Sequence, residues 1–100
     1  MCNFNKDDFV EFMQQGFGII IDRSLVGEES IILYKDELDD KLISKQQKSK
    51  LPDRIIVHIF SYNEKSEWLA GILCDENTNV PLVLICIKDG NQIVEKPISP

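Results

Sequence analysis

The sequence has little histidine and cysteine and no apolar run long enough to span a membrane. It contains one histidine, one tryptophan and three cysteines among 100 residues. The apolar run at residues 80–87 is far shorter than the ~20 residues that a membrane helix needs. The N-terminus has neither the basic start nor the apolar stretch of a secretory signal, so we expect a cytoplasmic protein.

The scarcity of histidine and cysteine limits catalytic and metal-binding chemistry. Cys74 and Cys86 lie in apolar segments, which favours reduced, inert core thiols over nucleophiles. His58 and a cysteine from a neighbouring strand could form a catalytic dyad. The same residues could bind zinc, but the chain has no Cys-x-x-Cys pair, which is the strong sequence signal for a zinc site. We therefore expect no catalytic residue, no metal site and no cofactor.

Acidic residues outnumber basic ones, and this charge balance limits the kinds of molecule that the protein can attract. Seventeen acids against eleven lysines and arginines give a net charge of −6. Residues 1–40 hold ten acids and three basic residues, giving −7, whereas residues 41–54 hold five basic residues and one acid, giving +4. Because nucleic acids are polyanions, they would repel such a domain at long range. A protein with a basic surface is the easier partner.

The apolar pattern of the chain predicts one α+β domain over residues 1–100. A helix is predicted at residues 6–15, since Asn5 can cap it, Asp8 occupies its third position, and Gly16 can end it in a left-handed conformation. Apolar residues within this segment fall on one face, which indicates that the helix packs on a core.

The segments after this helix are short and rich in β-branched residues. Residues 17–22 are predicted to form a strand that pairs with residues 30–35 in an antiparallel hairpin. Apolar residues also recur at spacings of three and four, so one helix over residues 29–49 is the alternative. We favour a strand followed by a helix near residues 36–50, which ends before Pro52.

The second half of the chain predicts a meander of antiparallel strands. The expected strands are residues 54–62, 67–75, 80–88 and 92–96. We therefore expect a mostly antiparallel sheet of about five or six strands. Because its strands are apolar on both faces, the two helices should cover one face, and the other should be at least partly covered. Trp68 is expected in the core rather than at an interface.

The segment DELDDKLISKQQKSK, residues 36–50, begins with acids and ends with lysines, and two interpretations are open. In a helix that starts near residue 36, both groups would match the helix dipole and need no functional role. Alternatively, the acids and two glutamates before them form a docking surface for a basic protein. The candidate partner-binding residues are Glu28, Glu29, Asp36, Glu37, Asp39 and Asp40.

These features favour a non-enzymatic binding protein, a small acidic module that blocks or regulates a protein with a basic surface. Inhibitors and immunity proteins act in this way when they cover the basic groove of a nuclease. The alternative is a structural or regulatory subunit that self-associates, for instance as a homodimer, through a sheet edge or an apolar face. A small-ligand-binding domain and an enzyme are less favoured.

Overall fold

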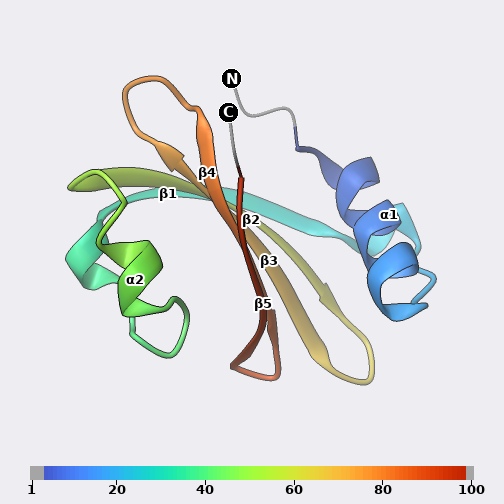
Figure 1. The fold of residues 1–100 in the computed structure, drawn as a ribbon. Coiled ribbons are helices and arrows are strands. Elements are labelled where there is room, and N and C mark those ends of the chain that lie inside the picture. Colours follow the sequence, from blue (N-terminus) through green and yellow to red (C-terminus); the bar gives the residue numbers. More distant parts are fainter. Residues whose placement is uncertain (1–3, 99–100) are drawn as a thin grey trace.

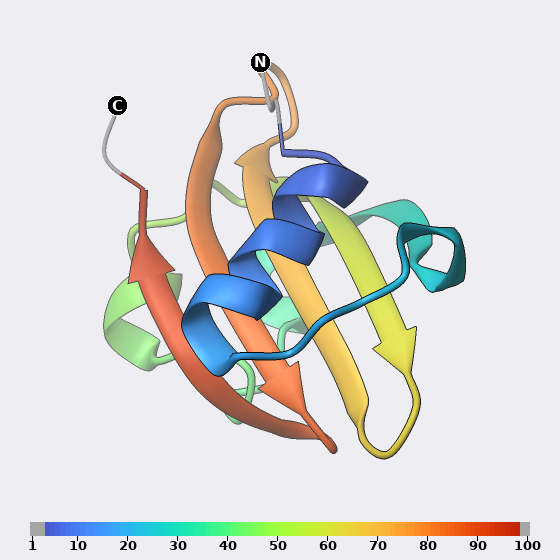
Figure 2. The same cartoon turned by 90° about the vertical axis from the view of Figure 1, so that its right-hand side faces the viewer.

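The computed structural model describes residues 4–98, which form a five-stranded antiparallel sheet with an α-helix on one face (Figures 1 and 2). The strands follow one another in chain order: β1 (Gly27–Tyr34), β2 (Arg54–Asn63), β3 (Glu67–Asp75), β4 (Pro81–Lys88) and β5 (Asn91–Pro97). The helices are α1 (Lys6–Phe17) and α2 (Lys45–Lys48), with 3-10 turns η1 (Arg23–Leu25) and η2 (Lys35–Glu37). The predicted α+β fold is confirmed. No helix among the described residues is long and apolar enough to cross a membrane.

The first helix begins where the sequence predicted and ends slightly later. The Asn5 side chain accepts a hydrogen bond from the Asp8 N–H (3.0 Å), and the Asp8 carboxylate accepts one from the Asn5 N–H (2.9 Å). This reciprocal capping satisfies two backbone donors at the start of α1. Gly18, rather than Gly16, ends the helix, with a left-handed φ of 68°. Glycine is suited to this position because it has no Cβ to clash there.

The predicted strand at residues 17–22, with its hairpin to residues 30–35, is wrong. After α1 the chain has no regular secondary structure until η1. Ile19 and Ile21 pack on the core beside α1, whereas Ile20 is 82% exposed. The alternating apolar pattern therefore reflects a connector that lies on the core with one side, without pairing to the sheet.

The other strand predictions are confirmed with small changes at their ends. The strand predicted at residues 30–35 is β1, which begins at Gly27 and pairs with β2. The bounds of β2 to β5 differ from the predicted ones by at most one residue. Each successive pair of strands is antiparallel and joined by a short turn.

The predicted helix at residues 36–50 is wrong over most of its length. Only α2 is helical, and Ser44 caps it by accepting a hydrogen bond from the Gln47 N–H (3.2 Å). Turns and bends lead from η2 to Ser44 and bury Leu38 and Ile43. The acids at residues 36–40 consequently do not lie in the first turn of a long helix, and the helix-dipole explanation of their placement is wrong.

The two helices lie on opposite faces of the sheet, whereas the sequence predicted that they share one (Figure 1). Alternate residues of β2 show the division. Phe60 and Tyr62 belong to the core beneath α1, while Ile55 and Val57 belong to the core beneath residues 35–51. We call these two sides of the sheet the α1 face and the α2 face.

Trp68 lies in the core of the α1 face, as predicted. Its side chain is 8% exposed, and its ring centroid is 5.1 Å from that of Phe17. The Lys88 ammonium lies 5.1 Å from the centre of the indole ring. As the sole tryptophan of the chain, Trp68 provides an intrinsic fluorescent reporter of packing between α1 and the sheet.

Candidate functional site

An apolar groove runs along the α2 face, where residues 35–51 leave part of the sheet uncovered. One part of it has a volume of about 220 Å³ and is lined by Ile31, Leu42, Ile59, Leu69, Gly71 and other apolar residues. Ile59 and Leu69 also line a cavity of about 350 Å³ beside the start of β1. The two cavities share these side chains and therefore adjoin each other on the α2 face across β1, β2 and β3, and we refer to them together as the groove.

The floor of this groove depends on Gly71. A Cβ at this position would lie 3.3 Å from the Ile85 side chain and 3.6 Å from that of Val57, so glycine keeps the neighbouring side chains close together. The groove was not predicted from the sequence, because both helices were expected on one face of the sheet and the apolar pattern does not show how much of the other face is covered. The short α2 segment covers only part of the α2 face, and that length could not be read from the apolar pattern.

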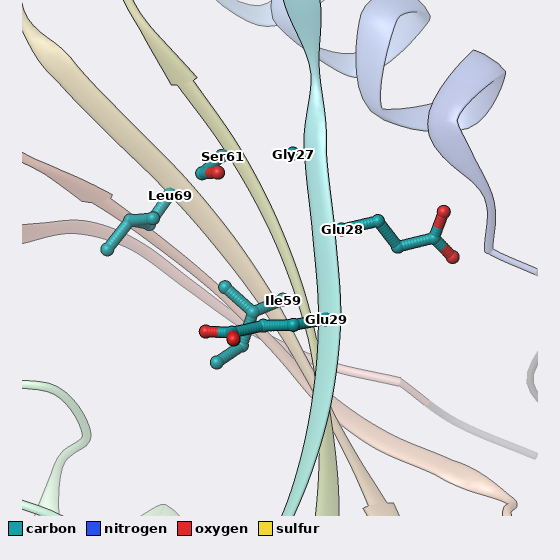
Figure 3. Close-up of a pocket in the computed structure, with 6 residues that line it drawn as sticks. All are labelled: Gly27, Glu28, Glu29, Ile59, Ser61 and Leu69. Carbon is teal, nitrogen blue, oxygen red and sulfur yellow. The ribbon is translucent and has the colours of Figure 1, made fainter.

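Acidic side chains stand at both ends of the groove. Glu29 lies at the end near the start of β1, and Glu37 lies in the wall of the 220 Å³ part. In Figure 3, the Glu29 side chain extends from β1 toward the side on which Ile59 of β2 and Leu69 of β3 lie, whereas the Glu28 side chain points to the other side. This difference follows from the alternation of side chains along a strand.

The structure divides the six candidate acids into two groups instead of one continuous patch. Glu28 and Glu29 lie near the start of β1, and the other four follow its end: Asp36, Glu37, Asp39 and Asp40. Glu29 and Tyr34 are separated by roughly 17 Å of strand. All six residues are exposed. Their role in binding stays a prediction, and the groove now supplies the apolar surface between them.

Three of the six acids have local roles that the sequence did not reveal. Glu37 accepts a hydrogen bond from the Tyr34 N–H (3.0 Å), Asp39 accepts one from the Lys41 N–H (2.9 Å), and Asp40 lies 3.6 Å from the Lys48 ammonium. Within residues 4–98, the side chains of Glu28, Glu29 and Asp36 form no hydrogen bond or ion pair. These three carboxylates are therefore the ones available to a partner.

His58 is hydrogen-bonded through both ring nitrogens. Its Nδ1 is 2.7 Å from the Ser30 Oγ, and its Nε2 is 2.8 Å from the Asn79 Oδ1. An amide oxygen only accepts, so Nε2 carries a proton, and in the neutral ring Nδ1 accepts from the Ser30 hydroxyl. The groove does not include these residues, nor does the cavity beside Trp68. Their arrangement ties β1 to β2 and to the turn before β4, which is a structural role.

The thiols of Cys74 and Cys86 are both fully buried in the core of the α1 face. Burial raises the pKa of the Cys86 thiol to about 11, because the apolar surroundings disfavour the thiolate. A thiol with this pKa is almost entirely protonated at neutral pH and is a poor nucleophile. The geometry therefore favours core packing for these residues.

We expect a chromogenic disulfide reagent to react with Cys74 and Cys86 only when the protein unfolds. Cys2 lies outside the described residues, so the measurement uses a Cys2→Ser variant. At pH 8, a thiol of pKa about 11 is only about one part in a thousand thiolate, and burial slows reaction further. Both thiols should react promptly in concentrated urea and slowly in buffer. Prompt reaction of both in buffer would contradict the buried assignment.

The raised pKa of Cys86 also gives a direction to the pH dependence of stability. In the unfolded chain this thiol ionises at lower pH than in the folded protein. Its contribution to stability is therefore fully present below the unfolded pKa and is lost as pH rises through about 11.

Neither a metal centre nor a relative identifies the function. Among residues 4–98, no group of three or more histidine, cysteine, aspartate or glutamate side chains is placed to hold a metal ion. No protein-family model matches the chain, and no significant similarity to a curated protein or to a solved structure was found. The groove and the charges around it are the features from which a function can be argued.

Proposed function

We propose that the protein is a non-enzymatic binding module that docks a basic segment of another protein in its acidic-ended groove, and so blocks or regulates that protein. The observation that supports this proposal is the coincidence of an open apolar groove with carboxylates at both of its ends. The apolar floor gains free energy when a partner removes it from water, and the carboxylates select a partner of positive charge.

The net charge of −6 supports the same partner class through long-range attraction. Glu29 and Asp36 would be the first residues to meet a basic surface, because the fold does not use their carboxylates. The fold does not use the Glu28 carboxylate either, but this side chain points away from Ile59 and Leu69. A nuclease surface that binds phosphates has the matching charge, so an inhibitor or immunity role fits this geometry. The location that we propose, the cytoplasm, is compatible with cysteines that are not joined in a disulfide in the described core.

The basic run at residues 41–54 does not oppose this proposal, since the fold uses two of its five positive charges. The Lys48 ammonium donates to the Leu38 carbonyl (2.9 Å) besides its ion pair with Asp40. The Arg54 guanidinium lies 3.1 Å from a carboxylate oxygen of Glu76. These contacts offset two of the positive charges in the run and so reduce its attraction for a polyanion.

Charge reversal at Glu29 tests the proposal. The partner is first isolated by affinity capture with the tagged wild-type protein from its native cells, and its association rate is then measured against ionic strength. Glu29→Lys should slow association by about three- to tenfold at low salt, and the defect should shrink as salt rises. These effects are expected because a carboxylate at the groove acts mainly on the rate of encounter.

Glu11→Lys is the matched control, since it changes the net charge equally from the exposed side of α1. It should alter the association rate by less than about twofold, because the groove lies on the other face. If Glu29→Lys associates no more slowly than Glu11→Lys, the groove is not the binding site. Failure to capture any stoichiometric partner would count against the binding function itself.

A further inference from the structure

The edge strand β1 lacks most of the features that normally keep sheet edges from pairing with other chains, and its only charged residues are Glu28 and Glu29 near its start. It carries three exposed large apolar side chains, Ile31 (39%), Ile32 (54%) and Tyr34 (55%). It contains no proline and no lysine, and its pairing with β2 has no bulge. Long, regular and apolar edges of this kind are templates for a further strand.

The opposite edge, β5, is protected. Its sequence contains Lys96 and Pro97, and its pairing with β4 is irregular next to Cys86. The Glu95 carboxylate also accepts a hydrogen bond from the Ser44 N–H (2.6 Å), which places the segment before α2 against this strand. The two edges of the sheet therefore differ, and β1 is the one suited to pairing.

The backbone groups that β1 presents outward can be identified from two hydrogen bonds. The Lys35 N–H donates to the Asp53 carbonyl (2.8 Å), one step beyond the paired residues Tyr34 and Arg54. In an antiparallel ladder, hydrogen-bonded positions alternate, so odd-numbered residues of β1 bond to β2 and even-numbered residues point outward. The Tyr34 N–H confirms this pattern, because it donates to the Glu37 carboxylate instead of to β2.

Three residues of β1 are left with backbone donors and acceptors that face away from the sheet: Glu28, Ser30 and Ile32. Beyond Ile32 the next outward donor, Tyr34, is already occupied by Glu37. The free edge thus consists of alternate positions centred on Ser30.

We propose that two copies of the chain pair antiparallel through β1, with a two-fold axis at Ser30. In this register, Ser30 lies opposite the Ser30 of the second copy, and Glu28 lies opposite the second copy's Ile32. Each pair exchanges both of its backbone hydrogen bonds, so the outward groups of the three residues are all satisfied. Glu29 lies opposite the second copy's Ile31, where the glutamate stem covers apolar surface.

The neighbouring registers are less favourable, and this singles out the one centred on Ser30. A two-fold axis at Glu29 would place the two copies of that glutamate opposite each other, and like charges directly opposite destabilise a strand pair. An axis at Ile31 would require the Tyr34 N–H, which Glu37 occupies. The edge is thus self-complementary about Ser30, which favours a second copy over an unrelated strand.

This dimer goes beyond the proposed binding function and needs no partner. It would join the two sheets into one, with both α2 faces on the same side, because the two-fold axis is perpendicular to the sheet. The two grooves would then meet near Ile31 and Glu29 of each copy, and a dimer could hold two basic segments.

Sedimentation of the purified protein over a range of concentrations tests the proposal. The wild type should change from a monomer of 11.5 kDa to a dimer as concentration rises toward roughly 1 mM. Ile32→Glu places an acid opposite each Glu28 and should raise the dissociation constant about tenfold or more. Ile32→Lys places a base there and should leave it within about threefold of the wild type.

Ile93→Glu is the matched control, because Ile93 is 41% exposed on β5 and the substitution has the same charge. It should dimerise like the wild type. A wild type that stays monomeric at roughly 1 mM overturns the dimer. Equal weakening by Ile32→Glu and Ile93→Glu, or by Ile32→Glu and Ile32→Lys, overturns the pairing through this register.

Amide hydrogen exchange and salt provide a second readout. In the dimer, the amides of Ser30 and Ile32 should become protected, while those of Ile31 and Leu33 are protected at all concentrations. Because both copies are acidic, salt should strengthen dimerisation, whereas it should weaken binding to a basic partner. The two proposals can therefore fail independently. Unprotected Ser30 and Ile32 amides in a dimeric sample would overturn the β1 interface.

Discussion

Replacing Phe60 with alanine should lower the free energy of unfolding by about 3–5 kcal/mol. Its side chain is 1% exposed, and its ring centroid lies 5.2 Å from that of Phe4 and 6.0 Å from that of Phe9. Phe60 thus joins α1 and the residues before it to the sheet. Truncation removes this apolar contact and leaves a cavity that the surrounding rings cannot fill without moving.

The effect is large relative to the ~5–15 kcal/mol by which domains are usually stable. For a chain of 100 residues, it corresponds to a melting temperature lower by roughly 12–40 °C. Urea unfolding monitored by Trp68 fluorescence measures it directly, because Trp68 lies in the same core. Ile20→Ala is the control, since Ile20 is 82% exposed and should change stability by less than about 0.5 kcal/mol. Similar losses in both variants would contradict the packing of α1 on Phe60.

The strands after residue 53 were predictable because local signals agree with the tertiary structure. Apolar segments there alternate with short polar turns, and the turn before β5 shows how strongly such residues determine a hairpin. Asp89 and Gly90 both have positive φ, 51° and 83°, as a two-residue hairpin turn requires. Glycine adopts such φ values without strain, so the position of the turn could be read from the sequence.

The segments at residues 17–22 and 36–50 were mispredicted because their apolar spacing is compatible with more than one structure. Ile19 and Ile21 have the spacing of a strand, yet they bury one side of an unpaired connector. Leu38 and Ile43 are buried from turns and bends rather than from a helix. The apolar spacing in these two segments reflects which side chains are buried, and it does not indicate which backbone groups form helix or strand hydrogen bonds. Lengths of regular structure depend on tertiary contacts that periodicity does not reveal.

The exposure of the candidate acids was predictable from the sequence, but their positions relative to one another and their internal contacts were not. Asp39 and Asp40 are adjacent candidates for charge reversal, but the Asp39 carboxylate accepts a hydrogen bond from the Lys41 N–H and the Asp40 carboxylate pairs with Lys48. Reversing them would alter the fold of this segment together with any partner contact. Glu29 is a cleaner probe because its carboxylate has no internal partner in the described chain and lies at the groove.

The irregular segment between η2 and α2 is expected to depend on Ile43 for its position on the sheet. Ile43 is 1% exposed and belongs to the core of the α2 face with Leu38 and Leu51. A single helical turn has little stability of its own, so apolar contacts must hold this segment in place. Ile43→Ala should therefore lower the free energy of unfolding by about 2–5 kcal/mol.

The same substitution should loosen one wall of the groove. Amide hydrogen exchange should accelerate most over residues 38–48 and little in α1, which packs on the other face. Gln46→Ala is the matched control, since Gln46 is an exposed residue of α2, and it should change stability by less than about 0.5 kcal/mol. If exchange in residues 38–48 is equally fast in the wild type and in Ile43→Ala, this segment is not docked through Ile43. The groove would then lose the wall formed by Leu38 and Leu42, and an apolar site for a basic partner would have to lie elsewhere on the sheet.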